Sequence, residues 1–156
     1  MLFRSQNPQA QVVAVDWRNV LEVAQENARR AGLDGRFRPL PGSAFEVEFG
    51  SGYDVALLTN FLHHFDAKEN INILRKCRAA LNPGGTLLTL EFVPNPDRVT
   101  PMASAAFSLT MLLNTPAGDA YTFAEYQSMW REVGFESHEL HDVPNSAQRL
   151  IVSRRK

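Results

Sequence analysis

The sequence predicts an α/β fold in which a mostly parallel sheet ends in an antiparallel hairpin. Short apolar runs, typical of strands covered on both faces, alternate with segments whose apolar residues recur at helical spacing. The last two apolar runs follow each other directly across the turn Pro144-Asn145-Ser146, which indicates a hairpin. With 156 residues, of which 44% are apolar, the chain is long enough for one domain, and we expect residues 1–156 to form it.

Each expected element begins or ends at a recognisable signal. Asp16 ends the first strand, and either Asp16 or Asn19 can cap the following helix, which Gly32 closes. Thr122 can cap a later helix, which Gly134 ends. In chain order we expect a strand over residues 12–15, a helix up to residue 31, strands over 37–40 and 55–59, a helix over 68–81, a strand over 86–92, helices over 102–113 and 123–133, and strands over 136–143 and 148–153.

Composition excludes several classes of protein. The 16 basic and 17 acidic residues nearly cancel, so we expect no nucleic-acid partner. The longest uncharged run, residues 99–118, contains Pro101 and Pro116 and is a poor membrane span. The one cysteine, Cys77, lies on an apolar helix face, so we interpret it as a buried thiol in a protein of the reducing cytoplasm.

The most informative stretch follows the strand at residues 55–59. Asn60, His63, His64 and Asp66 come directly after this strand, and ligands of open α/β sheets bind beyond the carboxyl ends of the strands. These polar residues are therefore candidates for a functional site. A metal site here lacks a second cluster of ligands, so we predict no metal. The helix that follows presents one apolar face, formed by Ile71, Leu74, Cys77 and Leu81.

Three segments resemble the class I S-adenosylmethionine-dependent methyltransferases: VVAVDW, the polar and aromatic residues after the strand at 55–59, and LNPGGTLLTLEF. A closer resemblance is to the branch that methylates hydroxyl groups of small molecules. That branch carries H-D-W-S-D-E followed by x-x-L-x-x-L-x-x-C, and residues 63–77 align with it without a gap. The resemblance covers residues 8–156. It implies a Rossmann-like sheet, S-adenosyl-L-methionine as cofactor, a small hydroxylated acceptor and, as an open alternative, a homodimeric parent enzyme.

The same resemblance implies roles for single residues. His63 takes the place of the general base, which removes the proton from the acceptor hydroxyl, and Glu91 matches a catalytic carboxylate that supports it. The branch's second supporting carboxylate falls on Ala120, with Asp119 beside it. We expect the acceptor pocket to be formed by Phe61, Met102, Phe107 and Met111, and the alternative is that these residues belong to the ordinary core.

The expected cofactor residues follow the ends of three strands. Asp16 can accept both ribose hydroxyls of a nucleoside, although it could equally cap the next helix. Ser43 and Ala44 fall where the family contacts the adenine, and Thr59 and Asn60 fall near the methionine end of the cofactor. His138 and His141, on a C-terminal strand, are interpreted as surface residues.

The chain departs from the family at its start. The family's glycine-rich cofactor loop and its first, central strand lie well before the position of Asp16. We therefore expect residues 1–156 to be a partial methyltransferase catalytic domain that is inactive by itself and binds the cofactor negligibly. Two alternatives stay open: a C-methyltransferase of the quinone-biosynthesis type, and a truncated chain without catalytic function. A dehydrogenase is disfavoured because no tyrosine is followed by lysine at the Tyr-x-x-x-Lys spacing.

Overall fold

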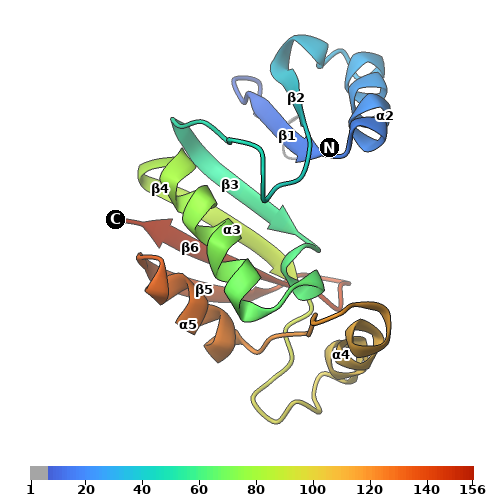
Figure 1. The fold of residues 1–156 in the computed structure, drawn as a ribbon, viewed down its shortest axis with the longest axis vertical. Coiled ribbons are helices and arrows are strands. Elements are labelled where there is room, and N and C mark those ends of the chain that lie inside the picture. Colours follow the sequence, from blue (N-terminus) through green and yellow to red (C-terminus); the bar gives the residue numbers. More distant parts are fainter. Residues whose placement is uncertain (1–6) are drawn as a thin grey trace. The chain divides into compact units, whose positions relative to one another are not determined.

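A computed structural model of the chain describes residues 7–156. Its internal contacts cluster into two compact units, residues 7–48 (unit 1) and residues 49–156 (unit 2). The order of helices and strands along the chain is the one expected from the sequence. Each unit is described by itself (Figure 1).

Unit 1 is a single strand–helix–strand element. Strand β1 (Val12–Asp16) leads into helix α2 (Arg18–Arg30), and a short 3-10 helix, η1 (Asp34–Arg36), precedes strand β2 (Phe37–Pro41). The two strands pair in parallel from Val12 opposite Phe37 to Asp16 opposite Pro41. Helix α2 buries Leu21 and Ala28, which belong to the small core of this unit, whereas Val20 and Val23 are exposed.

Unit 2 contains a four-stranded mixed sheet in the order β3-β4-β6-β5. Strands β3 and β4 are parallel, whereas β6 pairs antiparallel with both β4 and β5. The predicted α/β class, with a parallel part and a C-terminal antiparallel hairpin, is therefore confirmed. The elements are β3 (Tyr53–Thr59), η2 (Leu62–His64), α3 (Ala67–Ala80), β4 (Leu81–Glu91), α4 (Met102–Asn114), α5 (Phe123–Glu132), β5 (Phe135–Asp142) and β6 (Arg149–Arg155).

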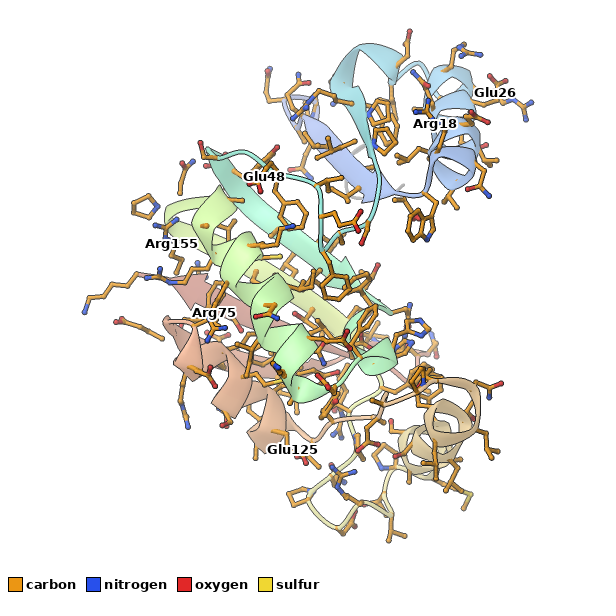
Figure 2. All side chains as sticks on the ribbon, viewed as in Figure 1. Arg18, Glu26, Glu48, Arg75, Glu125 and Arg155 are labelled. Carbon is orange, nitrogen blue, oxygen red and sulfur yellow. The ribbon has the colours of Figure 1, made fainter. Side chains whose placement is uncertain are left out.

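The core of unit 2 lies between this sheet and two helices. Helices α3 and α5 contact each other, and they pack on β4 and β5 respectively (Figure 1). Arg75, which lies on α3 (Figure 2), also donates to Glu132 of α5 at 2.8 Å. The largest fully buried apolar side chains are Leu62, Ile73, Leu74, Leu81, Leu87, Val93, Tyr126, Trp130, Phe135 and Ile151.

Two details of α3 and β4 differ from the sequence prediction. Ile73, rather than Ile71, is fully buried on α3, so the inward face is rotated from the one predicted. Strand β4 begins at Leu81 because Leu81 pairs with Tyr53, and regular pairing resumes at Thr86 after an irregularity. Gly84 in this irregular segment has a φ of 75°, a value that glycine adopts without strain. Residues 82–85 thus form an irregular insertion within β4, opposite the single residue Asp54 of β3.

Helix α4 has the predicted bounds to within one residue, and much of its apolar surface is exposed. Met111 is buried, whereas Met102 is 80% exposed and Leu113 is 83% exposed. An all-round apolar helix is expected to be buried or to lie against a partner. Within residues 7–156, most of the large apolar side chains of α4 are not covered.

Candidate functional site

The segment that joins β3 to α3, residues 60–66, forms a tight crossover. Asn60 has a φ of 53°, and its backbone N–H donates to Leu90 O at 3.0 Å, which holds the end of β3 to β4. The carboxylate of Asp66 accepts from Glu69 N at 2.8 Å and caps α3. The chain between these two fixed points turns as η2 and carries His63.

His63 and Glu91 form a buried pair. Their side-chain atoms Nδ1 and Oε2 lie 2.6 Å apart, and the residues are 4% and 0% exposed. Glu91 is the last residue of β4, and its other oxygen, Oε1, accepts from Phe61 N and Leu62 N, both at 2.8 Å. One carboxylate therefore holds both the crossover backbone and the imidazole, and the proximity expected from the resemblance is observed.

The hydrogen bonds of Glu91 indicate the tautomer of His63. An ionised carboxylate only accepts hydrogen bonds, so its contact with Nδ1 requires a proton on that nitrogen. In the neutral imidazole Nε2 then carries the lone pair and can accept a proton. The arrangement is that of an oriented base, in which a carboxylate fixes the ring and stabilises its protonated form.

Aromatic side chains cover the His63 ring. The ring of Phe107, from α4, meets it edge-on at a centroid distance of 4.8 Å, and Phe92 stacks on Phe107 at 4.0 Å. Phe107, which was expected at the acceptor pocket or in the core, thus lies directly against the imidazole, whereas Met102 is exposed.

His64 differs from its neighbour in its surroundings. Burial lowers the pKa of His64, His63 lowers this pKa further, and Glu91 acts in the opposite direction. Its ring packs at 4.3 Å from that of His63 and at 6.1 Å from that of Phe65. His64 therefore belongs to the aromatic packing of the crossover.

In unit 1, Asp16 lies exposed at the carboxyl end of β1. Its Oδ1 accepts from Trp17 N at 2.7 Å, and its backbone oxygen accepts from Gly42 N at 2.9 Å. The residue at the N-cap of α2 is Trp17, without a side-chain cap, so the expectation that Asp16 or Asn19 caps this helix is wrong. A charged carboxylate that does not cap a helix, at the end of a parallel strand, suits a ribose-binding role, which stays a prediction.

The remaining predicted cofactor residues lie at or just after the ends of β2 and β3. Ser43 Oγ accepts from Phe45 N at 3.3 Å, and Ala44 is half-buried beside it. Thr59 is exposed and pairs with Leu90 of β4. Asn60 Oδ1 accepts from Gln148 Nε2, so the amide of Asn60 is held by the turn between β5 and β6. The roles of these four residues stay predictions.

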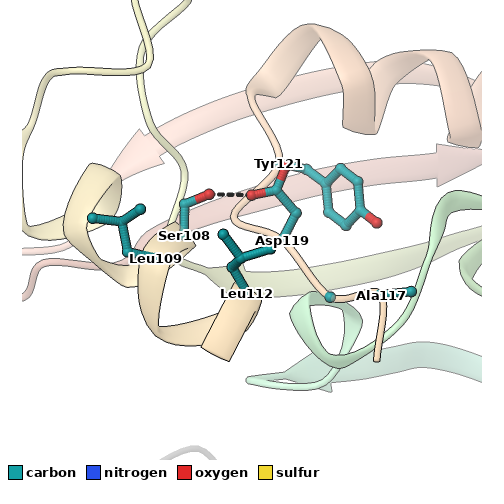
Figure 3. Close-up of a pocket in the computed structure, with 7 residues that line it drawn as sticks. Ser108, Leu109, Leu112, Ala117, Asp119 and Tyr121 are labelled. Atoms are coloured by element: carbon teal, nitrogen blue, oxygen red, sulfur yellow. Dashed lines mark hydrogen bonds between the residues drawn. The ribbon is translucent and has the colours of Figure 1, made fainter. Parts of the chain in front are cut away.

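The expected second carboxylate is replaced by a different arrangement. Ala120 is fully buried, whereas Asp119 accepts from Ser108 Oγ and, at 3.0 Å, from Arg98 Nη1. Arg98 also donates to Glu125, and the hydrogen bond to Glu125 raises the pKa of Arg98. Asp119 borders an open pocket of about 440 Å³, whose lining residues are Ser108, Leu109, Leu112, Ala117, Gly118, Asp119 and Tyr121 (Figure 3).

Three residues that sequence reasoning missed hold the crossover in place. Asn70 Nδ2 donates to Leu62 O and Phe65 O, at 2.9 and 3.2 Å. Tyr121 donates from its hydroxyl to Phe65 O at 2.7 Å. Gly118 packs so closely that an added Cβ would collide with the carbonyl oxygen of His63. No local sequence pattern predicts these contacts, because each contact joins segments that only the folded structure brings together.

Neither a metal cluster nor a membrane span is found in the part of the chain that the structure describes. Among residues 7–156, no group of three or more His, Cys, Asp or Glu side chains could hold a metal ion. None of the helices in the same range is long and apolar enough to cross a membrane.

Comparison with known proteins places the chain in a family. Residues 3–136 match the O-methyltransferase domain family, and the chain belongs to this family. The match confirms the resemblance on which the site residues were chosen.

Individual relatives agree with this family. A 3-hydroxy-5-methyl-1-naphthoate 3-O-methyltransferase of Streptomyces sahachiroi is 36% identical over 83% of this chain and 37% of its own length. An L-tyrosine C(3)-methyltransferase of Streptomyces lavendulae is 26% identical over 88% of this chain and 38% of its own length. A solved structure from Nostoc punctiforme, assigned as an O-methyltransferase, has a TM-score of 0.95 and 50% identity over 98% of this chain and 47% of its own. The chain thus spans less than half the length of these relatives.

Proposed function

We propose that the protein transfers a methyl group from S-adenosyl-L-methionine to a hydroxyl group of a small molecule, with His63 as general base. The observation that carries this proposal is the buried pair in which Glu91 Oε2 lies 2.6 Å from His63 Nδ1. Membership of the O-methyltransferase domain family supports it.

Proton removal from the acceptor is the step that these residues perform. A hydroxyl group is a weak nucleophile until its proton leaves, and an imidazole is well suited to take that proton near neutral pH. Glu91 holds the proton on Nδ1, which keeps Nε2 available, and its negative charge stabilises the imidazolium that forms. Nε2 takes the proton of the acceptor hydroxyl, which frees the oxygen to bond with the methyl carbon that the cofactor would supply. As that bond forms, the sulfonium–methyl bond would break and its electron pair would stay on the sulfur of the leaving S-adenosylhomocysteine.

The described residues offer groups that fit the cofactor. S-adenosyl-L-methionine supplies an electrophilic methyl group on a sulfonium centre. The exposed carboxylate of Asp16 would accept hydrogen bonds from the ribose hydroxyls, and Ser43 and Ala44, which follow the neighbouring strand, would lie near the adenine. Within unit 2, Thr59 ends β3 and Asn60 follows it, and by the same placement rule these two residues are proposed for the methionine end. The fit rests on the placement of these residues at strand ends, where ligands of α/β sheets bind.

The acceptor is proposed to be a small aromatic hydroxyl compound. Support comes from the aromatic pair of Phe92 and Phe107 beside His63, and from the naphthoate acceptor in the name of the Streptomyces sahachiroi relative.

A homodimeric parent protein would cover the exposed apolar residues of α4, such as Leu113. A reducing cytoplasmic location suits the single free thiol of Cys77, whose pKa burial raises to about 12.

The test of this function replaces His63 in the protein expressed from its own gene at its natural length. His63→Ala is expected to lower the rate of methyl transfer to a phenolic acceptor by about 10²–10⁴-fold, because proton removal loses its base. The rate is followed by mass spectrometry of the methylated product. His141→Ala removes an exposed imidazole and is the matched control. A His63→Ala enzyme with undiminished turnover excludes His63 as the base.

C-methylation is the second candidate, because one relative is an L-tyrosine C(3)-methyltransferase. An acceptor whose hydroxyl is already ionised would react at a ring carbon without needing His63. The product distinguishes the two reactions. NMR of the purified product shows an O-methyl resonance for the first and a methyl group on a ring carbon for the second.

A further inference from the structure

Asn70 is the polar residue on the buried face of α3, in contact with the crossover. It is fully buried, as are Ile73 and Leu74 one turn further along the same helix. Both hydrogens of its side-chain amide are used, since Nδ2 donates to Leu62 O at 2.9 Å and to Phe65 O at 3.2 Å. These two carbonyl groups flank His63 and His64 in the sequence.

The free-energy cost of burying this amide indicates that its two donated hydrogen bonds are needed by the crossover. Within residues 7–156, Asn70 Oδ1 has no hydrogen-bond partner although it is buried. A buried polar atom without a partner destabilises a fold, and an apolar side chain at this place would avoid that cost. Asparagine is also a weaker helix former than Ile73 and Leu74 on the same buried face. The amide is therefore unfavourable for α3 and favourable only for the crossover.

Asn70 and Glu91 act on the crossover in complementary ways. Glu91 accepts from the N–H groups of Phe61 and Leu62, whereas Asn70 donates to the C=O groups of Leu62 and Phe65. The peptide groups on both sides of Leu62 are thus fixed, and Leu62 directly precedes His63. Both carbonyls keep another donor without Asn70, namely Phe65 N for Leu62 O and the Tyr121 hydroxyl for Phe65 O. Removal of Asn70 should therefore loosen the crossover without unfolding it.

We propose that Asn70 is a positioning residue, which holds the crossover so that His63 Nδ1 stays on Glu91. This inference rests on the proposed function, in which that contact keeps Nε2 ready to accept a proton. It assigns to α3 a part in the site, since none of the residues to which the family resemblance gives a role lies on this helix.

The test follows the Nδ1 proton of His63 by NMR in the chain labelled with ¹⁵N-histidine, with the signal assigned from its loss in His63→Asn. In the wild-type chain this proton is expected to exchange slowly with water. Asn70→Ala is expected to speed its exchange roughly tenfold, because two hydrogen bonds to the crossover are lost. Asn72→Ala, on the exposed side of the same helix, is the matched control and should leave the exchange unchanged.

Further variants separate positioning from stability. Ile73→Val lowers stability from the same buried face without removing a hydrogen bond, so an equal acceleration in this variant overturns the proposal. Unchanged exchange in Asn70→Ala also overturns it. If Asn70→Ala does not fold, Asn70→Ser takes its place, because it keeps one donor and should show a smaller acceleration of exchange. Unchanged exchange in Asn70→Ser then overturns the proposal. If exchange responds as expected while His63→Ala retains full methyl transfer, the positioning role stands and the proposed function fails.

Discussion

The two units hold their candidate site residues in opposite ways. In unit 1, Asp16 is exposed, and within residues 7–156 its carboxylate bonds only to the backbone of the next residue. In unit 2, Glu91 is fully buried and joins β4 to a crossover 28–30 residues earlier in the sequence. A carboxylate of the first kind is available to a ligand and contributes little to folding. A carboxylate of the second kind is part of the fold, so its chemical and structural roles cannot be separated by simple deletion.

The chain carries a separate fluorescent reporter for each unit. Of its two tryptophans, Trp17 lies in unit 1 and is 62% exposed, whereas Trp130 lies in unit 2 and is fully buried. The variant Trp17→Phe leaves Trp130 as the reporter of unit 2, and urea unfolding of this background gives a free energy of unfolding for that unit.

The largest expected effect is the loss of the buried carboxylate. Glu91→Ala should lower the free energy of unfolding of unit 2 by about 3–5 kcal/mol, because three donors then lose their acceptor in a buried site. Asp16→Ala in unit 1 should change the stability of its unit by no more than about 0.5 kcal/mol. Urea titration measures both, with Trp130 fluorescence in the Trp17→Phe background for Glu91→Ala and far-UV circular dichroism for Asp16→Ala. Equal effects of the two substitutions would contradict the contrast between the units.

The next largest expected difference in unfolding free energy is between substitutions of Gly118 in unit 2 and Gly35 in unit 1. In unit 2, a Cβ at Gly118 would collide with His63 O and lie 2.6 Å from Thr115 Oγ1, whereas in unit 1 a Cβ at Gly35 meets nothing within 4 Å. Gly118→Ala should therefore cost about 1–3 kcal/mol of unfolding free energy through overpacking. Gly35→Ala should stay within about 0.5 kcal/mol of the wild type. Trp130 fluorescence reports the first and circular dichroism the second.

The difference between local and long-range contacts explains which features of the fold and the site could be predicted from the sequence. Periodicity and capping signals are local, so they gave the order of elements, and the Thr122 cap of α5 is confirmed as a full capping box with Glu125. The His63–Glu91 pair came from the resemblance, because nothing local links these two residues. Asn70 was missed because an asparagine within a helical pattern gives no sign of the distant groups that its side chain contacts. The irregular insertion before Thr86 depends on pairing with β3, which no local pattern encodes.

The capping box of α5 sets the third prediction. Thr122 Oγ1 accepts from Glu125 N, and Glu125 accepts from Thr122 N at 2.7 Å. Thr122→Ala should lower the unfolding free energy of unit 2 by about 1 kcal/mol, the usual effect of a lost N-cap. Thr110→Ala removes an exposed hydroxyl within α4 and is the control, with an effect below about 0.5 kcal/mol. A loss of equal size in both variants would show that the cap does not stabilise α5.

The smallest expected effect concerns pH and His138 of unit 2. The expectation that His138 is a surface residue is wrong, since its ring stacks on Trp130 at 5.3 Å and its Nδ1 lies 3.0 Å from Ser153 Oγ. Burial lowers the pKa of His138, and the charge of Arg131 lowers it further. The unfolded chain therefore binds the proton more tightly than the folded chain. The stabilising contribution of the neutral ring is complete above the ordinary histidine pKa of about 6.5 and is lost as the pH falls through the lower pKa of the folded state.

His138→Gln should accordingly weaken the dependence of stability on pH on the acid side of 6.5, whatever it does to stability at pH 8. The unfolding midpoint in urea, followed by circular dichroism from pH 8 to pH 5, measures this slope. The slope should decrease without vanishing, because burial also lowers the pKa of His64 in the same unit. His141→Gln, at an exposed position on the same strand, is the control. A slope that falls as much in His141→Gln as in His138→Gln would show that the stacked ring of His138 does not cause it.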